Sequence, residues 1–185
     1  MSSQNIRKMV TTAILIALAV MFQYLRPLLG GSNPVSTYII SSLINLCLIV
    51  AACVVGLWSG VAISVVTPLI ALSQGHAVAF MVPWIMAGNA VLAIGFALFA
   101  RGAQGKSPAA WARFCAVGVI AALLKFAVIV LGQTIMLTSA QGKAFGIALG
   151  VASTAQIQQI ITAVIGMIVA KLVILALPAS VRPQG

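Results

Sequence analysis

The stretch AALLKFAVIV, residues 121–130, is apolar throughout except for Lys125. It lies in a longer apolar run, 110–137, which exceeds the roughly 20 residues that a helix needs to cross a lipid bilayer. A charge at the centre of such a helix costs about 2.5–3.5 kcal/mol on insertion scales, so it is usually paired or functional. The chain contains no aspartate and no glutamate, so no carboxylate side chain of the same polypeptide pairs with Lys125.

The composition of the whole chain is typical of a membrane protein. Of its 185 residues, 63% are hydrophobic and 5% are charged, whereas soluble domains carry roughly 25% charged residues. This length predicts a single membrane domain, residues 1–185. The net charge of +10 comes from basic residues that stand singly at the ends of apolar runs. That pattern indicates topology signals rather than a phosphate-binding surface, so we expect the lipid bilayer as a partner and no nucleic acid.

The apolar runs predict an all-α integral membrane protein built as a bundle of six transmembrane helices. The expected helices cover residues 9–25, 38–57, 60–74, 77–100, 110–137 and 155–177. Pro27 follows the first and Pro178 the last, and proline cannot continue a helix without loss. The first helix follows a basic start, as in a signal peptide. Its apolar run is long for one and no small-x-small cleavage site follows, so we expect it to be retained.

Six helices place both termini on one side of the membrane, and the basic residues indicate which side. One side collects Arg7, Lys8, Arg101, Lys106, Arg113 and Arg182, and the other collects Arg26 and Lys143. Because lysine and arginine are enriched in cytoplasmic loops, we expect both termini to be cytoplasmic. The loops 26–37, 75–76 and 138–154 then face outward.

Polar residues gather in the outer half of these predicted helices. Lys125 and Asn89 each lie about twelve residues from the outer ends of their helices, which at 1.5 Å per residue places both roughly 18 Å deep. Gln156 and Gln159 share one helix face, and Trp84 offers a ring for stacking. The predicted substrate-binding residues are Lys125, Asn89, Gln159, Gln156, Trp84, His76, Gln74, Arg26 and Asn33.

Each of these residues also has a structural interpretation. Lys125 could be satisfied by carbonyl oxygens or by the carboxylate of a partner subunit, and Asn89 could make a hydrogen bond between helices. The glutamines could lie at the level of the lipid headgroups, and Trp84 could anchor the chain at the membrane interface. Gly166 and Ala170, four residues apart, have the spacing of closely packed helices, most often within a bundle.

Several kinds of chemistry are excluded or disfavoured by the residues present. Without acidic residues the chain has no carboxylate proton relay, no paired-carboxylate acid–base site and no Ser-His-Asp triad. It has no phosphate-binding loop of the Gly-x-x-x-x-Gly-Lys-Ser/Thr type. Cys47, Cys53 and Cys115 lie inside apolar runs without a close Cys-x-x-Cys pair, so we expect neither a metal site nor a disulfide. The chain is therefore predicted to be a binding protein, with no cofactor and no enzymatic activity.

Four segments resemble one family of membrane proteins. They are TPLIAL (67–72), VPWIMAGNAVL (82–92), AALLKF (121–126) and QQIITAVIG (158–166). With the length, the six helices and the alanine-rich first helix, they resemble the substrate-binding S components of energy-coupling factor (ECF) vitamin transporters. In one group of these proteins an Asn, a Lys and a Gln recur in helices four to six. Asn89, Lys125 and Gln159 match them.

The resemblance implies an energy source and a location. S components dock on a membrane coupling protein that carries two cytosolic ATPases, as part of an ABC importer in the bacterial cytoplasmic membrane. The docking motif, Ala-x-x-x-Ala in the first helix, matches Ala13 and Ala17, and the gate over the pocket corresponds to 26–37. Since an anion would neutralise Lys125, we expect an anionic, vitamin-like substrate. The alternatives are an assembly subunit whose partner supplies an acid to Lys125, or a small autonomous facilitator.

Overall fold

A computed structural model describes residues 2–31, 33–138 and 156–178. This part of the chain is helical, as predicted, and contains no strand. The long helices are α1 (Ser3–Tyr24), α2 (Pro34–Val50), α3 (Leu57–Ser73), α4 (Val82–Phe99), α5 (Pro108–Thr138) and α8 (Ile157–Ala176). Short helical segments accompany them: η1 (Pro27–Leu29), η2 (Ala51–Val55) and η3 (Ala79–Met81).

These helices correspond one by one to the six predicted apolar runs. Five helical stretches are long and apolar enough to cross a membrane, and α3, with 17 residues, is shorter. The chain is therefore a multi-pass membrane protein. Two of the predicted topology signals lie outside the described residues: Lys143 in the predicted loop 138–154, and Arg182.

Some helices begin or end at other residues than predicted, because local capping and backbone geometry set their ends. α1 begins at Ser3, six residues before the apolar run, because the Ser2 side chain accepts a hydrogen bond from the backbone N–H of Asn5. Asn33 caps α2 in the same way, accepting from the Ser36 N–H at 2.8 Å. The break between α2 and α3 lies at Gly56 rather than at the predicted 58–60. There the π-helical η2 ends and the glycine adopts φ 131°, a value that side chains disfavour.

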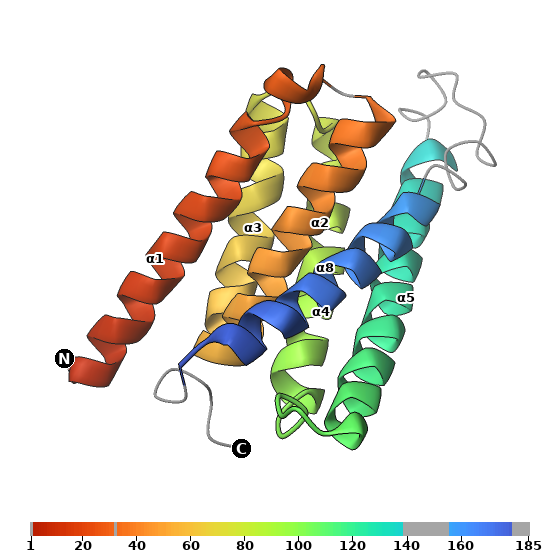
Figure 1. Cartoon of the computed structure of the whole chain (residues 1–185). Coiled ribbons are helices and arrows are strands. Elements are labelled where there is room, and N and C mark those ends of the chain that lie inside the picture. Colours follow the sequence, from red (N-terminus) through yellow and green to blue (C-terminus); the bar gives the residue numbers. More distant parts are fainter. Residues whose placement is uncertain (1, 32, 139–155, 179–185) are drawn as a thin grey trace.

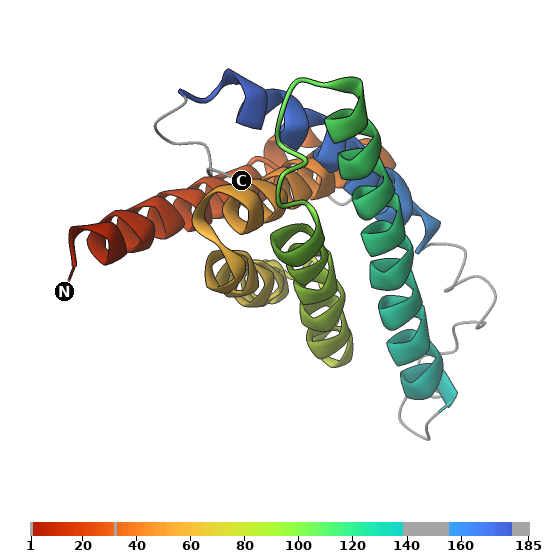
Figure 2. The same ribbon diagram turned by 90° about the horizontal axis from the view of Figure 1, so that it is seen from below.

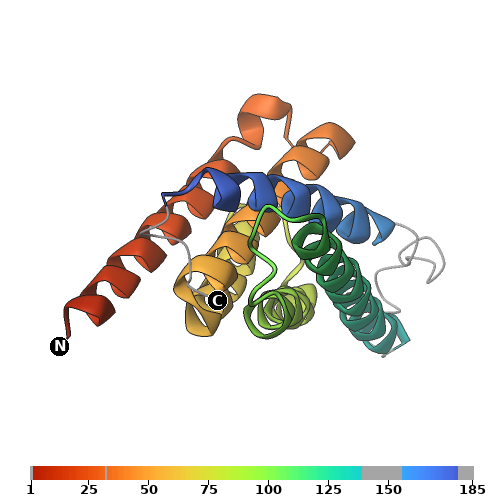
Figure 3. The same ribbon diagram turned by 60° about the horizontal axis from the view of Figure 1, so that its bottom comes forward.

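The helices have a common orientation that defines two ends of the bundle. We call basal the end that holds the N-terminus and the α4–α5 loop, and apical the end that holds η1 and the α3–α4 turn (Figure 1). α2 packs mainly on α8, which crosses it obliquely, and α4 lies between α3 and α5 (Figures 1 and 3). At this crossing Gly166 faces the α2 backbone, since a Cβ on it would lie 2.8 Å from the carbonyl oxygen of Ser42.

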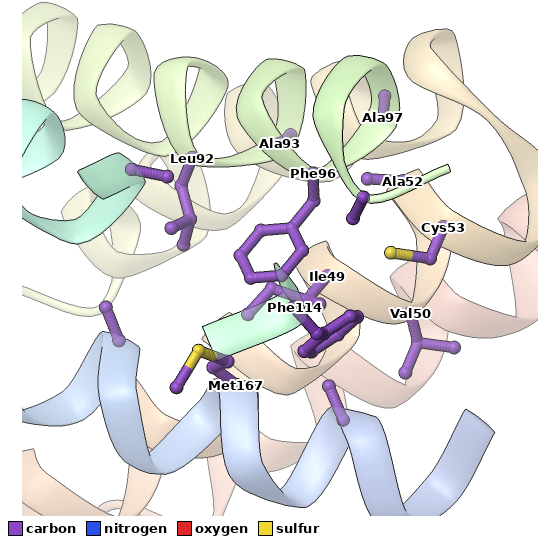
Figure 4. Close-up of a cluster of buried hydrophobic side chains, with 14 of the residues drawn as sticks. Ile49, Val50, Ala52, Cys53, Leu92, Ala93, Phe96, Ala97, Phe114 and Met167 are labelled. Carbon is purple, nitrogen blue, oxygen red and sulfur yellow. The ribbon is translucent and has the colours of Figure 1, made fainter. Parts of the chain in front are cut away.

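The main hydrophobic core lies toward the basal end of the bundle, as the positions of its residues on the helices show. Figure 4 shows its side chains. Ile49 of α2, Phe96 of α4, Phe114 of α5 and Met167 of α8 meet there, each no more than 3% exposed. The rings of Phe96 and Phe114 lie 5.0 Å apart between centroids. These contacts fill the space between four helices below the middle of the bundle.

A second buried lysine connects α8 to the α4–α5 loop at the basal end. Lys171 of α8 is fully buried, and its Nζ donates to the carbonyl oxygens of Ala103 and Gly105 in the α4–α5 loop, the latter at 2.9 Å. The ammonium also lies 4.9 Å from the ring centroid of Phe114. Gln104 of the same loop donates to the carbonyl of Cys53 at 3.2 Å. We call this set of contacts the basal clamp.

α1 lies at the edge of the bundle. Its basal half projects away from the other helices (Figure 2), and Met9 and Ile14 are 61% and 60% exposed. Ala13 and Ala17, the predicted docking residues, both lie on the exposed side, whereas Ala19 is fully buried. The small residues of α1 are therefore available to lipid or to another helix.

Candidate ligand-binding site

A polar cavity of about 250 Å³ reaches from the apical end of the bundle to its middle. Helices α1 to α5 and α8, with the α3–α4 turn, all contribute to its walls. Its polar lining consists of Gln23, Arg26, Thr37, Ser41, Asn45, Thr67, His76, Asn89, Lys125, Gln156, Gln158 and Gln159. The remaining lining residues, such as Ile44 and Ile85, are apolar. A small pocket with a few convergent polar groups is the usual form of a small-molecule site.

Lys125 lies at the inner end of this cavity. Its side chain is 2% exposed, and Nζ donates to Oδ1 of Asn45 on α2 at 2.8 Å. Nδ2 of Asn45 in turn donates to Oγ1 of Thr162 on α8 at 3.3 Å. This chain of hydrogen bonds links α5, α2 and α8 and orients the lysine. It supplies a neutral oxygen, however, and the charge of the ammonium has no counter-charge in the sequence.

Two buried amides line the cavity with hydrogen-bonding capacity to spare. Gln23 is 3% exposed; its Nε2 donates to the carbonyl oxygen of Thr67 at 2.7 Å, and its Oε1 has no partner among the described residues. Asn89 is 5% exposed and, within the same part of the chain, its amide makes no side-chain hydrogen bond. Buried polar groups are normally satisfied, so unpaired ones facing a cavity are suited to a ligand.

A polar stripe on α2 forms one wall. Thr37, Ser41 and Asn45 follow each other at four-residue intervals, so they share one face of the helix, and all three line the cavity. At the apical end Nη1 of Arg26 donates to Oγ1 of Thr37 at 3.4 Å. The stripe therefore has Arg26 at its apical end and Lys125 at its inner end.

His76 lies in the turn between α3 and η3, at the apical side of the cavity. Burial, and secondly the positive charge of Arg26, lower the pKa of His76 below its ordinary value. The imidazole is therefore neutral at pH 7. It adds a polar, neutral ring to the apical rim.

The structure brings together six of the nine predicted substrate-binding residues. Those in the cavity lining are Lys125, Asn89, Gln159, Gln156, His76 and Arg26. The other three lie elsewhere. Trp84 packs on Gly132 of α5, so closely that a Cβ there would lie 2.0 Å from the indole ring. Asn33 caps α2, and Gln74 caps the end of α3.

The α2 side of the site was not predicted from the sequence. Asn45, Thr37 and Ser41 are not among the predicted residues, although their four-residue spacing in an apolar run was a readable signal. Single small polar residues are common in membrane helices and pack against neighbouring helices. Only the contact of Asn45 with Lys125, which are eighty positions apart, distinguishes this stripe from ordinary packing.

Comparison with known proteins adds no assignment. No protein-family model matches the chain, and no curated protein and no solved structure shows significant similarity to it.

Proposed function

We propose that this protein is the substrate-binding subunit of an ECF-type ABC importer. It captures a small, water-soluble, anionic vitamin or vitamin precursor from outside the bacterial cytoplasmic membrane. An ATP-driven coupling module, consisting of a membrane protein and two cytosolic ATPases, then allows the ligand to be delivered inward. The observation that carries the proposal is the buried ammonium of Lys125, held by a neutral amide at the inner end of a polar cavity.

An anionic ligand supplies what this site lacks. The Lys125 charge is removed from water, and the chain has no acid to compensate it. A ligand carboxylate beside Nζ would form a charge-assisted hydrogen bond, which is roughly twice as strong as a neutral one. The same absence of acids means that the cavity walls do not repel an anion. A cationic vitamin would meet both Arg26 and Lys125, so it is disfavoured.

The packed core below Lys125 supports a subunit that needs a partner rather than an autonomous facilitator. Phe114 lies eleven residues below Lys125 on α5, about 16 Å along the helix, and packs in the hydrophobic core. The basal clamp lies at the far side of this core. A ligand next to Lys125 therefore meets packed side chains on the inward path, so its release requires a rearrangement.

The orientation of Lys125 weighs against the assembly-subunit alternative. Its neighbours Leu123 and Leu124 are 49% and 53% exposed on the outer face of α5, whereas Lys125 points into the bundle. A partner's carboxylate would have to enter the cavity to reach the ammonium. A small anion can do so without another polypeptide.

The proposal is tested by identifying the ligand and removing the charge. Mass spectrometry of the small molecule released from the purified protein on denaturation should identify an acid. Isothermal titration with carboxylate vitamins such as pantothenate, and with thiamine as the cationic comparison, then measures affinity. The Lys125→Met variant should lose roughly 2–5 kcal/mol of binding free energy. The exposed Lys106→Met variant, which removes the same charge outside the cavity, should bind like the parent.

Thermal melts without ligand accompany the titrations, so that loss of binding is separated from loss of folding. Unchanged affinity in a folded Lys125→Met protein would contradict the proposal. Stable co-purification with an acidic membrane protein and no small molecule would favour the assembly subunit.

A further inference from the structure

The two cations of the cavity are held at a fixed distance by one helix. Arg26 Nη1 contacts Thr37, and Lys125 Nζ contacts Asn45, at 3.4 Å and 2.8 Å respectively. Thr37 and Asn45 are eight residues apart on α2, which at 1.5 Å per residue separates them by about 12 Å along the helix axis. The cavity therefore has one positive group at each end, and α2 sets the spacing between them.

The wall between these cations is polar. The Ser41 hydroxyl lies halfway along the same stripe. Gln23 presents an unpaired, buried Oε1, and Asn89 contributes a second buried amide. Gln23 and Asn89 line the same cavity as Ser41, so a ligand that carries hydroxyl or amide groups suits it, since an apolar chain would leave them unsatisfied.

We propose that the site takes an extended ligand with an anionic group at each end and a polar middle. This inference rests on the proposed function and names its substrate class. One acidic group binds Lys125, and the other binds Arg26, which has five N–H donors in its guanidinium. Charge-assisted hydrogen bonds of about 2.8 Å at each end leave roughly 6 Å between the terminal anionic oxygens, or somewhat more where the cations are offset sideways.

That distance predicts a short ligand. An extended chain advances roughly 1.2 Å per bond, so about five to eight bonds join the two terminal oxygens. Dicarboxylates between succinate and pimelate cover this range and, because they lack the polar middle, test the two charged ends alone. The matching monocarboxylates, from butyrate to heptanoate, have the same chain lengths and lack the second charge.

The experiment is isothermal titration of the full chain in detergent with both series. The parent protein should bind the best dicarboxylate at least about tenfold more tightly than the monocarboxylate of equal length, a difference equivalent to 1.4 kcal/mol. Arg26→Gln should remove this preference, because it weakens dicarboxylate binding more than monocarboxylate binding. Lys125→Met should weaken both series. Arg7→Gln, which removes an exposed arginine outside the cavity, is the matched control and should behave like the parent.

The outcomes separate this inference from the proposed function. Equal affinity for the two series, with no effect of Arg26→Gln, would overturn the two-ended ligand while a Lys125-dependent anion site stands. Failure of every acid of both series to bind would overturn the two-ended ligand, and binding that survives in Lys125→Met would overturn both. Thermal melts of each variant show that it is folded before its affinity is compared.

Discussion

At the scale of single residues, the site depends on how one buried charge is accommodated. Lys125 is satisfied as a hydrogen-bond donor by Asn45 but not as a charge, because the chain has no acid. Breaking a buried contact by removing one partner costs more than removing both, since the remaining group is left unsatisfied. The pair therefore stabilises the empty protein while leaving the ammonium available to an anion.

Replacing Asn45 should reveal this dependence. Asn45→Leu keeps most of the volume but leaves the Lys125 ammonium without its acceptor, so the free energy of unfolding should fall by about 1.5–3 kcal/mol. Adding Lys125→Met in the same chain should restore much of the loss, because the orphaned charge is then gone. Thermal and denaturant melts in detergent measure both effects. If Asn45→Leu alone is as stable as the parent protein, the hydrogen bond between Lys125 and Asn45 contributes nothing to stability.

His76 should make stability depend on mildly acidic pH. Its pKa in the folded protein is lowered by burial and by Arg26, so the unfolded chain binds a proton at a higher pH than the folded chain does. Stability should be complete above the ordinary histidine pKa of about 6.5 and should fall as the pH decreases from there toward the lowered value. Melts between pH 5 and 8 should show a flatter profile for His76→Gln. Identical pH profiles of stability for the parent and His76→Gln would show that His76 does not cause the loss of stability at acidic pH.

At the scale of elements, two helices have contrasting roles. α8 is tightly packed: Gly166 meets the backbone of α2, and Ala170 is fully buried. α1 is loosely attached and exposes Ala13 and Ala17. The same spacing of small residues thus allows close internal packing in α8 and leaves an exposed face in α1. Substitutions that add bulk should have different effects in the two helices.

In α8, Gly166→Ala should loosen the crossing with α2. The added Cβ would lie 2.7 Å from Asn45 Cβ and 2.8 Å from the Ser42 carbonyl, and neither neighbour is a flexible side-chain end. Overpacking of this kind costs typically about 1–3 kcal/mol. A lower melting temperature, with weaker ligand binding because Asn45 is displaced, is expected. Gly105→Ala is the control, since its Cβ meets only Ala110, at 3.8 Å.

In α1, bulk on the exposed face should affect docking and not folding. Ala17→Leu should leave the melting temperature and ligand affinity of the isolated protein unchanged, while transport by the proposed importer is lost. Ala19→Leu is the matched comparison, because Ala19 is fully buried and the larger side chain should destabilise the isolated protein. Uptake of labelled ligand into vesicles measures transport. Retained uptake with Ala17→Leu would mean that this face meets lipid only.

At the scale of the whole molecule, the buried polar groups of the cavity and the main hydrophobic core lie in different halves of the bundle. The cavity occupies the apical half, and the hydrophobic core and the basal clamp occupy the basal half. Lys171 contributes to this asymmetry because it ties α8 to the α4–α5 loop. The buried lysines thus have different roles, one in a cavity and the other in a structural contact.

Lys171→Met should open the basal end. The carbonyls of Ala103 and Gly105 lose their donor, and a hydrogen bond to a charged group is worth about 1.5–3 kcal/mol. Hydrogen exchange of the loop 100–107 should become faster, and the melting temperature should fall. Ligand affinity of the folded protein should be retained, in contrast to Lys125→Met. Unchanged exchange in the loop would show that the clamp does not hold it.

The sequence by itself determined the membrane class, the helical fold and the approximate position of each helix, because twenty-residue apolar runs have few stable alternatives in a bilayer. It also identified Lys125 as the residue to explain, since a central charge is costly wherever the helix packs. The tertiary structure decided which residues meet it. Asn45 and the rest of the α2 stripe are distant from Lys125 in the sequence. An apolar pattern barely specifies how a helix is rotated about its axis when all of its sides are hydrophobic. In the folded chain the α2 stripe faces the cavity, whereas Trp84 packs on Gly132 outside the cavity lining.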